Sequence, residues 1–276
     1  MRVGGNLVAD DRDGKVKSAP EKSKGLSRKR KRRKKKAVRA VQRLFETCKQ
    51  VFAEGGPGVI PSPENVDRLR SLLDTLKPDD VGLSPNSPYF QNFGIDGPPP
   101  VTYLHLYDCP NFSIGIFCLP QAAAIPLHNH PSMTVFSKIL LGSMHIKSYD
   151  WVNDPQSSNV KIKSSSGACL AKVNTDAVFT APHRTSVLYP TTGGNLHCFT
   201  AVTSCAVLDV LGPPYSDDEG RTCMYYKEYA FSSFPGDATL ALGKNEEHAW
   251  LEESGSKPHD LVVRRAEYRG PRILEP

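Results

Sequence analysis

The feature that most constrains the fold is a series of short apolar or alternating segments that begins at residue 101. Turn-forming residues such as Pro, Asn, Asp and Gly separate these segments, and most are too short to form a typical helix. Closely spaced strands with such turns are typical of a β-barrel or jelly roll. The expected strands are Val101–Tyr107, Phe112–Cys118, Val135–Leu141, Ser143–Tyr149, Val160–Ile162, Ala177–Thr180, Ser186–Tyr189, His197–Val210 and Cys223–Tyr229.

Two helices are expected before the strands. Apolar side chains recur at three- and four-residue spacing between Val41 and Phe52, and a Gly-Gly-Pro-Gly turn at residues 55–58 then ends the helix. A second helix should begin at Pro63, with Ser62 as its N-cap, because proline is favoured in the first helical position. One face of each helix is apolar, so both helices should pack against the strands.

The charge divides the chain into a basic tail and an acidic body. Residues 1–43 carry 17 Lys/Arg and 4 Asp/Glu, which leaves 18 Lys/Arg and 25 Asp/Glu for residues 44–276. Residues 1–36 have almost no large apolar side chains, so burial cannot offset the entropy cost of ordering them. We therefore predict a disordered tail followed by one domain.

The expected division is a tail at residues 1–36 and a folded domain at 37–276. Within the domain, the helices should occupy residues 37–77 and the barrel about 100–268. The fold class is therefore mainly β, with N-terminal helices and a disordered basic tail.

The tail contains nine consecutive cations that match the pattern of a nuclear-localisation signal. An import receptor is therefore an expected partner, with the nucleus and cytoplasm as the expected locations. The alternative is a solvated tail with no targeting role. Because no aromatic residues or RNA-binding signature accompany the cations, specific nucleic-acid binding is not expected. The nine residues are Arg28, Lys29, Arg30, Lys31, Arg32, Arg33, Lys34, Lys35 and Lys36.

The seven cysteines do not suggest a disulfide framework or a zinc ribbon. Their number is odd, and no two of them form a C-x-x-C pair. The chain also has no apolar stretch near the ~20 residues that a membrane span needs. We expect a soluble protein of a reducing compartment, with no membrane partner. We also expect it to be a monomer.

Three histidines are candidates for a metal site. His128 and His130 lie two residues apart beside a predicted strand, so their side chains can point to the same side. His197 follows a Gly-Gly turn and begins a later strand, which a barrel can bring close to the first pair. A chance pair of surface or core histidines is the alternative. His183, which lies between two strands, is the other histidine most able to reach the same place.

The two histidine elements match the two halves of the cupin signature of a double-stranded β-helix. Cupins usually place a Glu shortly after the first two histidines, but Thr134 and Val135 occupy that region here. Three neutral imidazoles would leave a divalent metal with its full charge and with open positions. Such a centre favours an anionic ligand such as a thiolate. Zinc would also bind three histidines, so these residues alone leave a zinc hydrolase open.

The barrel region resembles the cysteamine dioxygenase and plant cysteine oxidase family over about residues 40–268. Four elements in order carry the resemblance: Pro-Leu-His128-Asn-His130-Pro-x-Met133, Gly-Gly-Asn-Leu-His197, Asp209-Val-Leu-Gly212-Pro213-Pro214-Tyr215 and Cys223-x-Tyr225-Tyr226.

The resemblance implies a cupin that holds iron(II) with three histidines and uses both atoms of O₂ to convert a thiol to a sulfinic acid. It further implies that the substrate is an N-terminal cysteine of a protein, notably of ethylene-response transcription factors. Oxidation would then feed the arginine N-degron pathway, so that the enzyme acts as a sensor of oxygen and hypoxia.

Three further residues of the matching elements are candidates for the site. Asp209 ends an apolar strand, where its carboxylate could bind the α-ammonium group of an N-terminal cysteine; an ordinary turn-initiating Asp is the alternative. Tyr215 could hydrogen-bond a bound oxygen species or the substrate. Cys223 could lie near the site, although isolated cysteines in strands are usually small core residues.

Two other functions remain open from the residues alone. One is a cupin dioxygenase of a free small thiol such as cysteamine or cysteine. The other is a basic nuclear interaction protein in which the barrel is only a scaffold, although three intact candidate ligands disfavour it. The acidic body would attract a cationic peptide N-terminus more strongly than an anionic amino acid.

Overall fold

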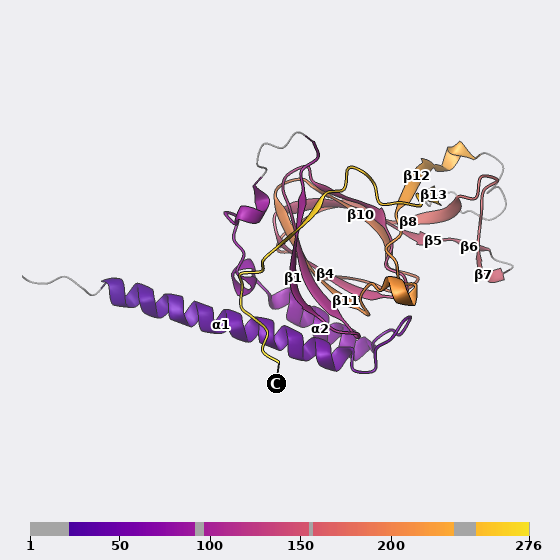
Figure 1. The fold of residues 1–276 in the computed structure, drawn as a ribbon. Helices are drawn as coiled ribbons and strands as arrows, with labels where there is room; N and C mark the ends of the chain where they lie inside the picture. The colour runs from indigo at the N-terminus through magenta and orange to yellow at the C-terminus, as the bar shows by residue number, and fades with distance from the viewer. Residues whose placement is uncertain (1–21, 92–96, 155–156, 235–246, 276) are drawn as a thin grey trace, which may run out of the picture.

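The computed structural model describes residues 22–91, 97–154, 157–234 and 247–275. Two six-stranded sheets curl around a common interior, which Figure 1 shows nearly end-on. The first sheet has the order β14-β1-β2-β11-β4-β9, and the second has the order β12-β13-β8-β5-β10-β3. Strands β6 and β7 form a separate two-stranded ribbon. The mainly β fold that we predicted, a double-stranded β-helix, is confirmed.

The bounds of the strands are as follows. In the first sheet they are β1 Val101–Asp108, β2 Ser113–Leu119, β4 Thr134–Leu141, β9 Ser186–Leu188, β11 Cys205–Gly212 and β14 Val263–Ala266. In the second sheet they are β3 Ala124–His128, β5 Ser143–Trp151, β8 Cys169–Thr180, β10 Leu196–Ala201, β12 Tyr226–Ala230 and β13 His248–Glu253. The ribbon consists of β6 Asn153–Asp154 and β7 Ser157–Lys161.

Each predicted segment overlaps an observed strand, but one segment that we predicted as a single strand is divided in two. The segment His197–Val210 is two strands, β10 and β11, rather than one. The chain leaves the second sheet after Ala201 and enters the first sheet at Cys205. The connection between them is exposed, and its Thr203 side chain accepts a hydrogen bond from the backbone of Ser143. A polar turn therefore interrupts the apolar run. Strands β6, β13 and β14 were not predicted.

The two helices are α1, Lys22–Val51, and α2, Pro63–Thr75. The predicted N-cap of α2 is confirmed, because the Ser62 hydroxyl accepts a hydrogen bond from the backbone of Asn65 at 3.3 Å. Four short 3₁₀ helices connect other elements: η1 Pro78–Val81, η2 Pro88–Phe90, η3 Asp217–Glu219 and η4 Phe231–Ser233.

The start of the first helix differs from our prediction. We assigned residues 1–36 to a disordered tail, but α1 already begins at Lys22 and includes all nine consecutive cations. Lysine and arginine are good helix formers, so a run of them can extend a helix that tertiary packing stabilises further along. In Figure 1 this part of α1 extends beyond the barrel. Residues 1–21 lie outside the described part of the chain.

The apolar faces of both helices pack against the outer face of the first sheet. Phe45 and Phe52 of α1 and Leu73 of α2 share one buried cluster with Ile116 of β2 and Leu208 of β11. Full burial of each such side chain contributes roughly 1.5–3 kcal/mol. The helices therefore cover the outer face of that sheet, so the residues that alternate with this cluster on β2 and β11 face the barrel interior.

The barrel interior has a core of its own. It joins Val207 of β11 and Ile139 of β4 to Phe199 of β10 and Met144 of β5, so it draws on both sheets. Among the residues that the structure describes, no helix is long and apolar enough to span a membrane.

Candidate metal centre

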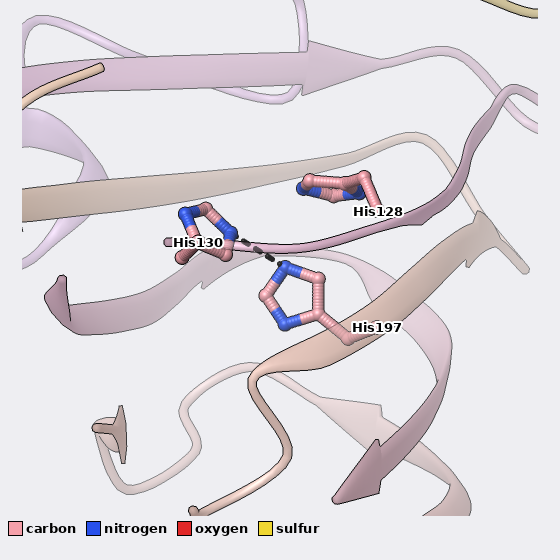
Figure 2. Close-up of side chains that lie close together, drawn as sticks. All are labelled: His128, His130 and His197. Atoms are coloured by element: carbon pink, nitrogen blue, oxygen red, sulfur yellow. Dashed lines mark hydrogen bonds between the residues drawn. The ribbon is translucent and has the colours of Figure 1, made fainter. Parts of the chain in front are cut away.

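His128, His130 and His197 converge inside the barrel, as Figure 2 shows. His128 is the last residue of β3 and lies directly opposite His197 of β10 in the antiparallel pair. His130 lies two residues beyond His128, after the strand has ended. The antiparallel pairing of β3 and β10 therefore brings together two histidines that are 69 positions apart.

The three imidazoles are close enough to share one ion. One ligand atom from each lies within 4.8 Å of the other two, and this is the single such group that includes histidines among the described residues. The Nε2 atoms of His130 and His197 are 3.0 Å apart. Two nitrogens bound at right angles to an ion at about 2.1 Å would also lie about 3 Å apart. The spacing therefore fits metal ligands.

Burial favours the neutral, metal-binding form of these side chains. All three histidines are buried, with at most 7% of the surface exposed. Desolvation lowers the pKa of His128 to about 4, and it lowers the pKa of His130 and of His197 well below the usual range. A neutral imidazole keeps a lone pair for a metal, whereas a protonated one does not.

Two of the rings are oriented by hydrogen bonds from Nδ1. The Nδ1 atom of His128 lies 2.8 Å from the carbonyl oxygen of Pro126, which can only accept a hydrogen bond. The Tyr215 hydroxyl donates to the carbonyl of Asn129 at 2.7 Å, so its oxygen accepts from Nδ1 of His130 at 2.9 Å. In both rings the proton is on Nδ1, so Nε2 is free to bind a metal.

Asp209 faces the same interior from the opposite sheet. It lies on β11, two residues from Val207 of the interior core, and directly opposite Ser137 of β4. Its Oδ1 atom is buried without a hydrogen-bond partner. Burial raises the pKa of Asp209 to about 7, and the nearby Ser137 side chain partly opposes this rise. A buried carboxylate with a free oxygen is able to bind a cationic group.

Tyr215 and Cys223 lie next to the ligands rather than among them. Tyr215 contacts His130, as described above, and burial raises its pKa well above the usual range. Burial raises the pKa of Cys223, and the nearby hydroxyls of Tyr215 and Tyr225 partly oppose this shift. Asp209 also acts electrostatically on Tyr215. The structure therefore gathers these candidates beside the histidines, whereas their roles stay predictions.

A small cavity reaches His197 from the side of the barrel. Its volume is about 80 Å³. It lies between β9 of the first sheet and β5, β8 and β10 of the second. Ser137, which lies directly opposite Asp209, and Ser148 lie in its wall with apolar side chains such as Phe179. The wall of the cavity therefore includes both His197 and the residue opposite Asp209.

Our sequence reasoning missed two asparagines that hold the loop of His130. Asn195 hydrogen-bonds to both the backbone N–H and the carbonyl of His130. The Asn129 side chain accepts from the backbone of Met224 at 3.0 Å and donates to the Tyr226 hydroxyl at 3.2 Å. The only signal in the sequence is that both lie within the matching family elements.

The remaining histidines lie away from the centre. His183, our alternative candidate, is exposed, and its Nδ1 atom contacts the carbonyl of Arg184 at 2.9 Å. Among the described residues it belongs to no group of metal ligands. His145 pairs with Asp176 at 2.7 Å, and His105 pairs with Asp108 at 2.8 Å.

Comparison with known proteins places this geometry in a family. The model of the PCO_ADO family matches residues 72–273. The chain belongs to the PCO_ADO family. This membership confirms the resemblance that we drew from the four sequence elements.

Several relatives align with the chain over most of their length. The chain is 52% identical to plant cysteine oxidase 2 of Arabidopsis thaliana, over 99% of this chain and 97% of that protein. It is 53% identical to plant cysteine oxidase 1 of the same plant, over 86% of this chain and 81% of that protein. It is 30% identical to human 2-aminoethanethiol dioxygenase, over 77% and 82% of the two chains.

Similar solved structures include an RmlC-like cupin protein from Desulfovibrio desulfuricans. It is 22% identical with a TM-score of 0.27, and the match covers 42% of this chain and 84% of that one. An oxalate oxidase structure is 16% identical with a TM-score of 0.28, over 42% and 46% of the two chains.

Proposed function

We propose that this chain is an iron(II)-dependent thiol dioxygenase that oxidises the N-terminal cysteine of protein substrates to cysteine sulfinic acid. Both atoms of O₂ enter the product, so that R–SH and O₂ give R–SO₂H. The observation that carries the proposal is the pairing of three neutral histidine ligands with a buried carboxylate that has a free oxygen, Asp209, in one barrel interior.

The ligand set supports a thiol as the substrate. His128, His130 and His197 carry no negative charge, so a divalent ion among them keeps its full charge and its open positions. These three residues would hold iron(II), which would supply the redox chemistry between the thiol and O₂. The role of the protein is to keep the three imidazoles neutral and to shield the site from water.

Asp209 supports a substrate with a free α-amine. Its unpartnered Oδ1 atom can accept a charge-assisted hydrogen bond from the ammonium group of an N-terminal cysteine. The pairing would compensate the buried carboxylate and would hold the sulfur at a fixed distance from the amine. An amine whose charge has been removed by acetylation could not make this contact.

Tyr215 supports the site through His130. Its hydroxyl accepts the Nδ1 hydrogen of His130 and donates to the backbone of Asn129. It therefore fixes the tautomer and the direction of one ligand. Cys223 lies near the same hydroxyl, which partly opposes the rise that burial causes in the pKa of its thiol.

The decisive test is an oxidation assay with purified protein. The protein is loaded with iron(II) without air, mixed with O₂ and a Cys-initiated peptide, and the peptide is analysed by mass spectrometry. We expect a gain of two oxygen atoms on the cysteine. If no thiol gains oxygen while the iron is bound, the chain is not a thiol dioxygenase.

Matched substrates decide which thiol the enzyme prefers. The same peptide with an acetylated N-terminus should be oxidised far more slowly, because it cannot pair with Asp209. Free cysteamine and free cysteine test the second function that the sequence leaves open. Faster oxidation of either free thiol than of the peptide would overturn the choice of protein substrates.

We further propose that the substrates are ethylene-response transcription factors, whose oxidised N-termini enter the arginine N-degron pathway in response to oxygen. The 52% identity to a plant cysteine oxidase over nearly the whole chain supports this proposal. In plant cells, loss of the enzyme should stabilise these factors in air, and His197→Ala should fail to restore their degradation.

The basic start of α1 supports import into the nucleus in addition to a cytoplasmic pool. Five of its nine consecutive cations are exposed where side chains are described: Lys31, Arg32, Arg33, Lys35 and Lys36. Such a segment is accessible to an import receptor. Alanine substitution of these five residues in a fluorescent fusion should shift the protein to the cytoplasm, and an unchanged distribution would contradict the proposal.

A further inference from the structure

The Gly193-Gly194-Asn195 segment between β9 and β10 is part of an element that carries the family resemblance, yet it contains no metal ligand. Its three consecutive backbone N–H groups all point at one carboxylate. Gly193 donates to Asp150 Oδ2 at 3.2 Å, and Gly194 and Asn195 donate to Asp150 Oδ1 at 2.8 and 3.4 Å. Asp150 thus anchors the turn that leads into His197.

The shape of this turn needs its two glycines. Both have φ of +81°, a conformation that other residues rarely adopt. A Cβ atom on Gly194 would also lie 2.5 Å from Oγ of Ser148, the residue directly opposite His197 on β5. In this shape the successive N–H groups form a concave site that suits an anion, which Asp150 of the same β5 strand provides.

The third residue of the turn connects it to a second ligand. Asn195 is buried, and its Nδ2 group donates to the carbonyls of His130 at 2.9 Å and Tyr189 at 2.7 Å. Its Oδ1 atom accepts from the backbone N–H of His130 at 3.0 Å. Asn195 therefore binds both sides of the His130 backbone, much as a neighbouring strand would.

These contacts form one connected path. Asp150 fixes the turn, the turn fixes the start of β10 with His197, and the Asn195 side chain fixes His130. His130 lies beyond the end of β3, so no strand pairing holds it. We propose that Asp150 and Asn195 are positioning residues that set the distance between the metal ligands His130 and His197. The proposal rests on metal binding by the three histidines.

Metal binding by variants tests this role without an activity assay. Cobalt(II), whose absorption spectrum reports its ligand geometry, is titrated into Asn195→Ala, Asp150→Asn and the native protein. Loss of contacts that orient ligands typically weakens metal binding roughly 10–100-fold. We expect a weakening in that range for Asn195→Ala, together with a changed spectrum. Asp150→Asn keeps one acceptor oxygen, so its effect should be smaller, about 10-fold.

Asp176→Ala is the matched control, because Asp176 is a carboxylate of the neighbouring strand β8 that pairs with His145 and Lys147. It should bind cobalt like the native protein. If the native protein binds no cobalt, the proposed metal site itself is wrong. If it binds cobalt and both variants match it within twofold with the same spectrum, the positioning role is overturned. Should Asn195→Ala fail to fold, Asp150→Asn decides the question.

Discussion

Two layers of side chains in the barrel interior lie on the same four strands, but one layer is apolar and the other is polar. The apolar layer consists of Ile139, Ile146, Phe199 and Val207, and the polar layer consists of Ser137, Ser148, His197 and Asp209. Each residue of one layer lies two positions from a residue of the other on β4, β5, β10 or β11, so both layers face inward. The cross-strand partners match as well.

The difference between the layers shows how the fold supports the site. Side chains of the apolar layer belong to or pack against the interior cluster, and their burial stabilises the barrel. The polar layer includes Asp209, whose free Oδ1 opposes folding, because a buried polar atom without a partner costs roughly 1–3 kcal/mol. The apolar layer therefore provides stability, whereas the polar layer provides ligands and charge.

The largest expected effect is on the polar layer. His197→Ala removes a ligand, so metal affinity should fall by more than the 100-fold that loss of a supporting contact can cost, and oxidation should be lost with it. The barrel should stay folded. Metal content after purification and circular dichroism measure the two outcomes. His145→Ala, a histidine that pairs with Asp176 on β8, is the control. Retained iron would mean that His197 is not the third ligand.

Two substitutions on β4 test the roles of the two layers separately. Ile139→Ala should destabilise the protein by about 2–5 kcal/mol, because it leaves a cavity in the apolar layer. The folded variant should bind metal nearly as well as the native protein. Ser137→Ala, two residues away, should change stability little but reduce oxidation, because it alters the surroundings of Asp209. Chemical denaturation measures the stability of each variant, and the peptide assay measures its rate of oxidation. If both substitutions changed stability and oxidation equally, the two layers would not have separate roles.

The loss of folding stability caused by the polar layer should depend on pH, because Asp209 is titratable. The carboxyl ionises near its ordinary value of 3.8 in the unfolded chain but near 7 in the folded protein. Between these values the folded state holds a proton that the unfolded state has lost. Asp209 therefore costs no stability below about pH 4, and its destabilising effect grows as the pH rises until it is complete above about 7.

Asp209→Asn should remove this pH dependence. At about pH 8 the metal-free variant should be more stable than the native protein, by at most about 4 kcal/mol. At about pH 4 the difference should vanish. Urea unfolding across this range is the measurement. A native protein whose stability does not fall relative to the variant as the pH rises would show that Asp209 is not buried as described.

The smallest expected effect concerns a contact beside the polar layer. Tyr215→Phe removes the hydroxyl that orients His130, so metal affinity should fall about 10-fold, at the low end for such contacts. The metal spectrum should change as well. Tyr229→Phe removes a hydroxyl that donates to Glu252 instead, so this control variant should bind metal normally. Equal affinity of the two variants would show that the hydroxyl does not position the ligand.

Much of the site could be predicted from the sequence, because the candidate ligands lie where strand alternation and turns determine the direction of the side chain. The spacing of His128 and His130 and the Gly-Gly turn before His197 predicted a shared metal, and the three rings do converge. The helix start at Ser62 followed from local capping chemistry. Asn195 and Asp150 were not predicted, because polar residues in turns are common and their partners are distant in the chain.

The sequence by itself determined the mainly β fold, the three candidate ligands and the family, because strand periodicity, turn residues and motif order are local properties. Only the tertiary structure decided that His197–Val210 is two strands and which side chains face Asp209 across the barrel. These features depend on contacts between distant segments. The two interior layers show this most clearly, since the same alternation places both inside and only the strand register aligns His197 with Ser148 and Asp209 with Ser137.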